Sequence, residues 1–239
     1  MNTFNNGPEG EIKTGTVATY LLSSLSGVFP PILFWLAGDW RWIEGWIFSA
    51  LFCLLSLATV FYLYLKDPAL LNERFGSPVQ KNQKSWDKFL LVIFFFAFLV
   101  WYAIMPLDAR QFGWSPPFPV WAKVIGAILF SLGFYLLYRA MKENTYAAPV
   151  IKMQKERGQT VIATGPYSIV RHPMYTGGTL LFFGGPLLLG SFYGLVTGFL
   201  LSLILALRTF GEEAMLRTEL AGYKEYSKRV RWRLIPFLF

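Results

Sequence analysis

The chain has 239 residues, of which 54% are hydrophobic and only 15% are charged. Soluble domains carry about 25% charged residues, so this composition excludes an ordinary soluble domain and predicts a membrane protein. The formal net charge of +8 is explained by cytoplasmic loops rich in Lys and Arg rather than by nucleic-acid binding. Because Cys53 is the single cysteine, intrachain disulfides and CxxC-type metal sites are excluded.

Four apolar blocks occupy the first part of the chain, at residues 17–37, 42–65, 89–106 and 120–141. Each is long enough to cross a hydrocarbon core of about 30 Å as a helix. Pro30-Pro31 interrupts the first block, and tryptophans cluster around the turn that follows it, as in an interfacial aromatic belt. In the polar connection 66–88, Asp67-Pro68 predicts the start of a short helix. We expect its apolar residues to lie on the membrane surface; they are Leu70, Leu71 and Phe75.

The next apolar stretch, residues 177–207, is too long for one ordinary span, since as a single helix it would measure about 45 Å. Gly184-Gly185-Pro186 and Gly190-Ser191 interrupt it near its middle. We therefore predict a tight hairpin of two short or tilted helices.

The distribution of Lys and Arg supports this hairpin. Three polar segments are rich in these residues, at 66–88, 142–172 and 208–239, whereas the other two connections carry one each. The positive-inside rule then predicts six spans with both termini in the cytoplasm. A single helix over 177–207 would place one basic segment on the wrong side. The predicted fold is an all-α polytopic membrane protein with about six transmembrane helices and a C-terminal helical hairpin.

The motif GPYSIVRHPMY, residues 165–175, precedes the hairpin. Pro173 disfavours a helical conformation for His172 and suits the first turn of the next helix. The N–H groups of that turn are suited to an anionic group of a ligand. His172 is the only histidine; taken alone, it is interpreted first as a capping or loop residue, with a proton switch as the alternative. A metal is not expected, because one His without a Cys cluster supplies too few ligands.

A second group of charged residues follows the hairpin. Arg208 and Glu212 share a helix face, and Glu213 is offset by about 100°. They form either an interfacial ion pair with a snorkelling arginine or a functional site. Arg before Glu is the less favourable order, and carboxylates at a helix C-terminus oppose the helix dipole, so function is a serious alternative. The basic run 228–233 is explained by contact with anionic lipid.

The order and spacing of these motifs resemble the isoprenylcysteine carboxyl methyltransferase family. The resemblance rests on GPYSIVRHPMY, an apolar hairpin, RTFGEE, and YKEYSKRV with a terminal IPF, over about residues 140–239. KDPALLNERFGSP also resembles the N-terminal half of prokaryotic members. The resemblance implies N-terminal transmembrane helices over 1–119 and a methyltransferase-like membrane domain over 120–239. It places the cofactor site on the cytoplasmic face of a prokaryotic plasma membrane.

The resemblance further implies methyl transfer from S-adenosylmethionine to a lipid-like acceptor, such as the carboxylate of a prenylcysteine, without a metal. Glu212 would hold a polar end of the cofactor, and Arg208 would bind the substrate carboxylate, which makes both catalytic residues. Gln159 stands where eukaryotic members have a histidine, which weakens the case for a prenylated protein as substrate. The other implied cofactor-binding residues are Gln159, Thr160, Val161, Ile162, Tyr167, His172, Pro173, Met174 and Tyr175.

Three alternatives stay open at this point. A reductase of the same superfamily would use NADPH and would need cations for its 2′-phosphate, which Lys152, Lys155 and Arg157 could supply. A phospholipid N-methyltransferase would have an amine as acceptor. A transporter would need charges inside its spans, and these spans are nearly free of them. The expected partners are membrane lipids and a lipid-like substrate, not nucleic acid.

Overall fold

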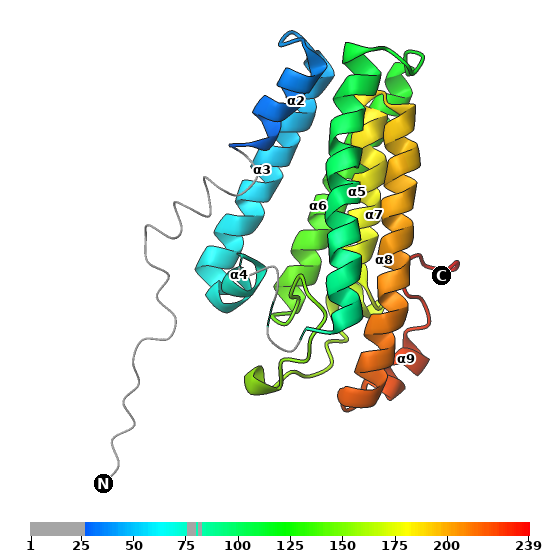
Figure 1. The fold of residues 1–239 in the computed structure, drawn as a ribbon. Coiled ribbons are helices and arrows are strands. Elements are labelled where there is room, and N and C mark those ends of the chain that lie inside the picture. The colour runs from blue at the N-terminus through cyan, green and yellow to red at the C-terminus, as the bar shows by residue number, and fades with distance from the viewer. Residues whose placement is uncertain (1–26, 76–79, 81–82) are drawn as a thin grey trace.

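The computed structural model describes residues 27–75, 80 and 83–239, and within these residues the chain forms eight α-helices and no β-sheet (Figure 1). The all-α prediction is confirmed for this part of the chain. The helices are α2 (Phe29–Ala37), α3 (Ile43–Lys66), α4 (Pro68–Phe75), α5 (Ser85–Pro106), α6 (Val120–Glu143), α7 (Pro173–Leu189), α8 (Phe192–Glu219) and α9 (Tyr223–Arg229). A π-helical turn, Leu107–Gln111, continues α5, and 3₁₀ turns lie at Lys155–Arg157 and Gly165–Ser168.

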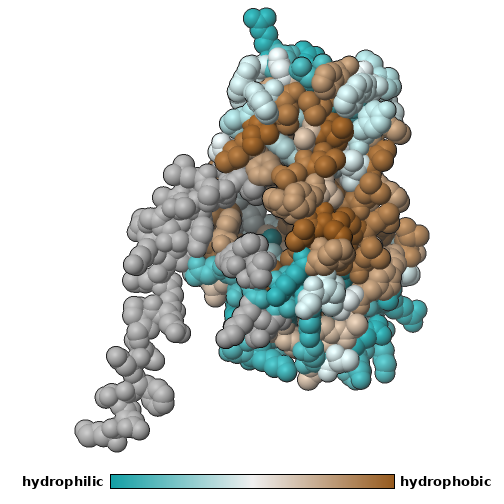
Figure 2. Space-filling model, in the orientation of Figure 1, coloured by the Kyte–Doolittle hydropathy of each residue, from teal (hydrophilic) through white to brown (hydrophobic). Residues whose placement is uncertain are grey.

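Four of the described helices are long and apolar enough to cross a bilayer: α3, α5 with its π-helical turn, α6 and α8. Their outward surfaces carry large apolar side chains that are more than half exposed, such as Leu54, Phe89 and Leu207. Figure 2 shows hydrophobic residues over the middle of one face and hydrophilic residues toward its ends. This surface is that of a protein surrounded by lipid along the middle of its helices.

The first predicted span lies partly outside the described residues, which begin at residue 27. In the described part, Pro30 and Pro31 lie in the first turn of α2, where proline is tolerated. Helix α7 has 17 residues and packs between α6 and α8 (Figure 1). The count of six spans stays a prediction.

The predicted hairpin is confirmed, because the stretch 177–207 is divided between α7 and α8. Helix α7 ends at Leu189, and Gly190 follows in a left-handed conformation with φ of +82°, which glycine adopts readily. The Ser191 side chain then caps α8 by accepting a hydrogen bond from the Gly194 N–H. Gly184-Gly185-Pro186 lies inside α7, so the chain turns at Gly190-Ser191 alone.

Helix α7 packs against α6 with almost no space between the two backbones. A Cβ added to Gly184 would lie 2.4 Å from the backbone nitrogen of Phe130. A Cβ added to Gly126 would lie 2.3 Å from the backbone nitrogen of Leu188. Glycine is required at both positions because any side chain would collide with backbone atoms that cannot move independently.

The three basic segments meet at one end of this bundle (Figure 1). Lys84 in the first segment pairs with Glu219 at the end of α8, at 2.7 Å. Lys152 in the second segment pairs with Glu73 of α4, at 2.9 Å. The structure therefore confirms that these segments lie at the same end of the helices, as the hairpin requires.

Helix α4 forms as predicted, but its apolar side faces the protein. The Asp67 side chain accepts a hydrogen bond from the Leu70 N–H at 3.0 Å, which caps the first turn. Leu70 and Leu71 are fully buried and pack with Val60 and Met141. The expectation that they lie on the membrane surface is wrong, because α3 and α6 already provide an apolar surface for α4.

At the opposite end of the bundle, Asp108 joins the end of α5 to the start of α8. Its carboxylate is fully buried and accepts hydrogen bonds from the Ser191 hydroxyl at 2.6 Å, the Ser115 hydroxyl at 2.7 Å and the Tyr193 N–H at 3.2 Å. A carboxylate at this point also interacts favourably with the dipole of α8.

We predict that Gly184→Ala destabilises the protein by about 1–3 kcal/mol, because the added methyl group forces α6 and α7 apart. The measurement is thermal unfolding of the purified protein in detergent. Gly178→Ala is the matched control on the same helix, since its Cβ would approach only the end of the Leu205 side chain, at 3.1 Å. Equal melting temperatures for the two variants would contradict the close backbone contact.

Candidate functional site

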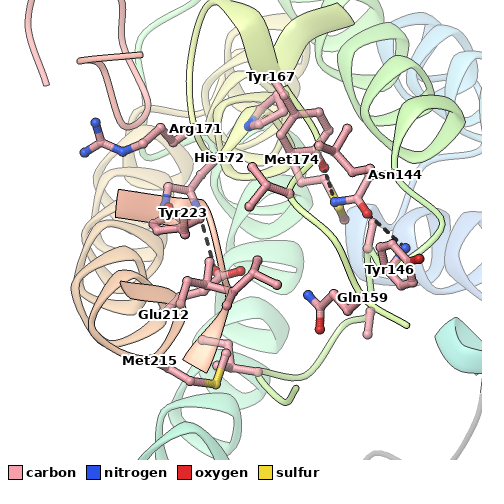
Figure 3. A pocket seen from close by; sticks show the side chains of 18 of the residues that line it. Asn144, Tyr146, Gln159, Tyr167, Arg171, His172, Met174, Glu212, Met215 and Tyr223 are labelled. Atoms are coloured by element: carbon pink, nitrogen blue, oxygen red, sulfur yellow. Dashed lines mark hydrogen bonds and ion pairs between the residues drawn. The ribbon is translucent and has the colours of Figure 1, made fainter. Parts of the chain in front are cut away.

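A cavity lies at the basic end of the bundle, between the start of α7, the end of α8 and the segment 144–162 (Figure 3). It has about 830 Å³ of empty space, part of it open to solvent. All ten residues implied as cofactor-binding line this cavity, namely Gln159, Thr160, Val161, Ile162, Tyr167, His172, Pro173, Met174, Tyr175 and Glu212.

The start of α7 positions one wall of the cavity. Pro173 is the first residue of α7, and His172 before it has non-helical backbone angles of φ −124° and ψ 63°, as the sequence predicts. The backbone of this segment is held by the C-terminal tail, because the His172 N–H donates to the Arg233 carbonyl at 2.9 Å. One turn into α7, the Tyr175 ring stacks on His172 with ring centres 5.6 Å apart.

A 3₁₀ turn at Gly165–Ser168 places Tyr167 in the second wall. Gly165 has a φ of +56°, and a Cβ there would collide with the Glu143 side chain at 2.6 Å. The Asn144 amide donates to the Tyr167 hydroxyl at 3.1 Å, while the Tyr226 hydroxyl donates to the Tyr167 carbonyl at 2.7 Å. Tyr167 is therefore fixed from both α6 and α9, and burial raises the pKa of its hydroxyl, which stays neutral.

The two adjacent glutamates of α8 have different surroundings. Glu212 lines the cavity, where it accepts a hydrogen bond from the Tyr175 hydroxyl at 2.8 Å and lies 3.5 Å from His172 Nδ1. Glu213 points away from it and is 3% exposed. Its carboxylate accepts from Arg171 Nε at 2.5 Å and Arg233 Nε at 3.2 Å. Glu213 thus holds the segment before α7 and the C-terminal tail together, which leaves Glu212 for a ligand.

His172 lies between the two glutamates, with Nε2 3.4 Å from Glu213 Oε1. Burial alone would lower the pKa of the imidazole, but hydrogen bonds and attraction from Glu212 and Glu213 outweigh it and raise the pKa above its ordinary value. The protonated ring is therefore favoured in the folded protein. It offsets the negative charge of two carboxylates that are one residue apart.

Arg208 does not line the cavity. Its guanidinium is 5% exposed and forms an ion pair with Asp87 of α5, with Nη2 2.7 Å and Nε 2.9 Å from Asp87 Oδ1. Its other contacts are the Pro149 carbonyl at 3.2 Å and the face of the Tyr175 ring, 5.6 Å from the ring centre. The ion pair anticipated as an alternative for Arg208 exists, but its partner is Asp87 rather than Glu212.

Several lining residues were not predicted from the sequence, and they come from the end of α6, the segment after it, the end of α8 and α9. The end of α8 and helix α9 lie within motifs that carried the resemblance, yet no spacing rule predicts which of their side chains line the cavity. Asp87 had a weak signal, as an acid at the start of an apolar block. The additional lining residues include Asn144, Tyr146, Ile151, Met215, Leu216, Tyr223 and Tyr226.

The raised pKa of His172 predicts a pH-dependent stability. The stabilisation from the protonated ring is fully present below the unfolded pKa of about 6.5 and is lost as the pH rises through the higher folded pKa. We expect the melting temperature of the wild type to fall across this window more steeply than that of His172→Gln, which has no titrating ring. Parallel melting curves for the two proteins over the same pH range would contradict this assignment.

A comparison with protein families matches the part of the chain that forms the cavity. Residues 121–221 match the model of a family described as phospholipid methyltransferase. A comparison with curated proteins gives no match. The matched residues contain nearly all of α6, the segment 144–162, α7 and all of α8, so they include most of the cavity walls. Over these residues the chain is similar to phospholipid methyltransferases, a family of the superfamily that also includes isoprenylcysteine carboxyl methyltransferases.

Proposed function

We propose that this chain is an S-adenosylmethionine-dependent methyltransferase, with the cofactor in the cavity and a lipid-like acceptor drawn from the bilayer. The observation that carries the proposal is that the implied cofactor-binding residues, from three separate segments, line one cavity. Bound S-adenosylmethionine supplies an electrophilic methyl group. The task of the protein is then to hold the acceptor in line with that group, which needs positioning rather than a covalent intermediate.

The cavity has apolar and polar walls, and each suits one part of this cofactor. Ile151, Val161 and Leu216 provide apolar surface for a planar base. Glu212 and His172 provide charged and hydrogen-bonding groups for the amino-acid and ribose parts. A ligand with one apolar and one strongly polar region matches such a cavity.

The charges around the cavity favour this cofactor over NADPH. The 2′-phosphate of NADPH needs free cations, and the lysine and the arginine that line the cavity are already paired. Lys152 pairs with Glu73 at 2.9 Å, and Arg171 with Glu213 at 2.5 Å. Arg157 does not line the cavity and donates its hydrogen bonds to nearby polar groups.

The position of the cavity suits two reactants of different polarity. It lies at the basic end of the bundle, which by the positive-inside rule we assign to the cytoplasm. The polar cofactor would enter from the cytosol, and the acceptor would approach along the apolar surfaces of the helices. This division is a physical reason for such an enzyme to be embedded in a membrane.

Two classes of acceptor follow from the surroundings of Arg208. A carboxylate, as in a prenylcysteine, would have to replace Asp87 on the Arg208 guanidinium, which can bind it through two hydrogen bonds. An amine of a phospholipid headgroup needs no such exchange and would instead approach the Glu212 carboxylate. The match to the phospholipid methyltransferase family favours this second candidate.

We predict that purified protein binds S-adenosylmethionine in a calorimetric titration and does not bind NADPH. Glu212→Ala and His172→Ala should each weaken that binding by about ten- to a hundredfold, because each removes a charged partner of the ligand. Glu219→Ala is the matched control, since Glu219 is on the same helix but pairs with Lys84 outside the cavity. Binding of NADPH alone would favour the reductase instead. Wild-type affinity for S-adenosylmethionine in both cavity variants would contradict the assignment of Glu212 and His172 to the site.

If the acceptor is a carboxylate, we predict that Arg208→Lys lowers methyl transfer by about ten- to a thousandfold, a barrier change of about 1.4–4 kcal/mol, because the planar fork is lost. Cofactor affinity should change much less. Arg217→Lys, on an exposed turn of α8, is the control. The assay offers membrane lipid extract and methyl-labelled cofactor.

The label also identifies the acceptor. A methyl ester releases its label as volatile methanol in alkali, whereas an N-methyl group keeps it. Loss of cofactor binding in Arg208→Lys, with an unchanged rate at saturating cofactor, would remove Arg208 from the acceptor side. Alkali-stable label on an amine would establish the second acceptor class.

A further inference from the structure

Asp87 lies outside the residues that match the methyltransferase family, yet its carboxylate joins three separate segments of the chain beside the cavity. It is in the first turn of α5 and is 0% exposed. Each of its oxygens has two close polar partners. Oδ1 accepts a hydrogen bond from Arg208 Nε at 2.9 Å and forms an ion pair with Arg208 Nη2 at 2.7 Å, and Oδ2 accepts from the Ile151 N–H at 2.9 Å and the Gln83 amide at 3.0 Å.

The contact with Ile151 fixes a wall of the cavity. Ile151 is 3% exposed and lines the cavity, and the start of α5 binds both of its backbone polar groups. Its N–H donates to Asp87, and its carbonyl accepts from the Lys84 N–H at 3.2 Å. Arg208 adds a hydrogen bond to the Pro149 carbonyl, two residues earlier. This wall segment has no helix or sheet of its own, so these contacts determine where its backbone lies.

The same carboxylate reaches the opposite wall through Arg208. The Arg208 guanidinium, oriented by Asp87, lies over the ring of Tyr175, and the Tyr175 hydroxyl donates to Glu212. Asp87 is thus bonded directly to one wall of the cavity and through one residue to the other. A group that only neutralised Arg208 would not need its second oxygen directed at Ile151.

We propose that Asp87 is a positioning residue that holds residues 149–151 and Arg208 in the geometry that binds the cofactor. This inference rests on the proposed function, and it assigns to the N-terminal helices a part in a site whose other described residues belong to the second half of the chain. Asp87 itself contacts no ligand; it acts through Ile151 and Arg208.

The test compares Asp87→Asn with Asp108→Asn in the full-length protein. Both residues are fully buried carboxylates of the same continuous helix, at its opposite ends, so Asp108→Asn controls for the loss of a buried carboxylate far from the cavity. Hydrogen–deuterium exchange in 149–151 is measured at the amides of Val150 and Ile151, because Pro149 has no N–H, and calorimetry reports on S-adenosylmethionine affinity. We expect faster exchange at 149–151 and about ten- to a hundredfold weaker binding in Asp87→Asn only.

A second variant separates positioning from charge balance. Asp87→Asn combined with Arg208→Gln leaves no unpaired buried charge, so its melting temperature should recover toward that of wild type. Its exchange at 149–151 should stay fast and its cofactor binding weak. Recovery of wild-type affinity in this double variant would overturn the proposal, as would unchanged exchange in Asp87→Asn. If exchange is fast in Asp87→Asn but the wild type binds no S-adenosylmethionine, the proposed function is refuted. The role of Asp87 in positioning residues 149–151 would then still stand.

Discussion

The backbone contact between α6 and α7 determines where the cavity lies. The glycines on this seam, such as Gly126 and Gly184, allow the two helices to meet without intervening side chains. Helices in lipid gain little from burying apolar surface against each other, so this kind of close packing is what holds them together. Because α7 is fixed along α6, its first turn lies beside the end of α6, and the turn at Gly190 returns α8 to the same end. The motif before α7 and the charged end of α8 can meet only through this arrangement.

Buried charges complete the site after the helices have brought it together. Glu213, His172 and Arg171 are all less than 7% exposed, and each has partners of opposite charge or hydrogen-bonding groups. Removing one partner from such a group leaves a buried charge without compensation, which costs about 3–5 kcal/mol. The tail takes part through Arg233, so residues far apart in the sequence become mutually dependent. A cavity built this way is rigid on the side where the polar part of a ligand would bind.

The sequence predicted the elements of this structure better than their contacts. Block lengths and the Lys and Arg distribution predicted the hairpin and the common end of the basic segments, because both depend on the bilayer alone. The expectation that Leu70 and Leu71 of α4 face the membrane was wrong, since hydropathy does not distinguish lipid from the apolar side of a neighbouring helix. The resemblance supplied residues that line the cavity, but it gave no partner for Arg208. That partner, Asp87, is 121 residues away in the chain, and no local pattern encodes such a pairing.

Helix α5 is joined to α8 by a buried carboxylate at each of its ends. Asp87 binds Arg208 at one end, and Asp108 binds the first turn of α8 at the other. The two carboxylates are separated by about 30 Å along one helix, the thickness of a hydrocarbon core. Sliding or tilting α5 against α8 would break at least one of these two sets of buried hydrogen bonds. Under the proposed function, an acceptor the size of a lipid would therefore enter between another pair of helices.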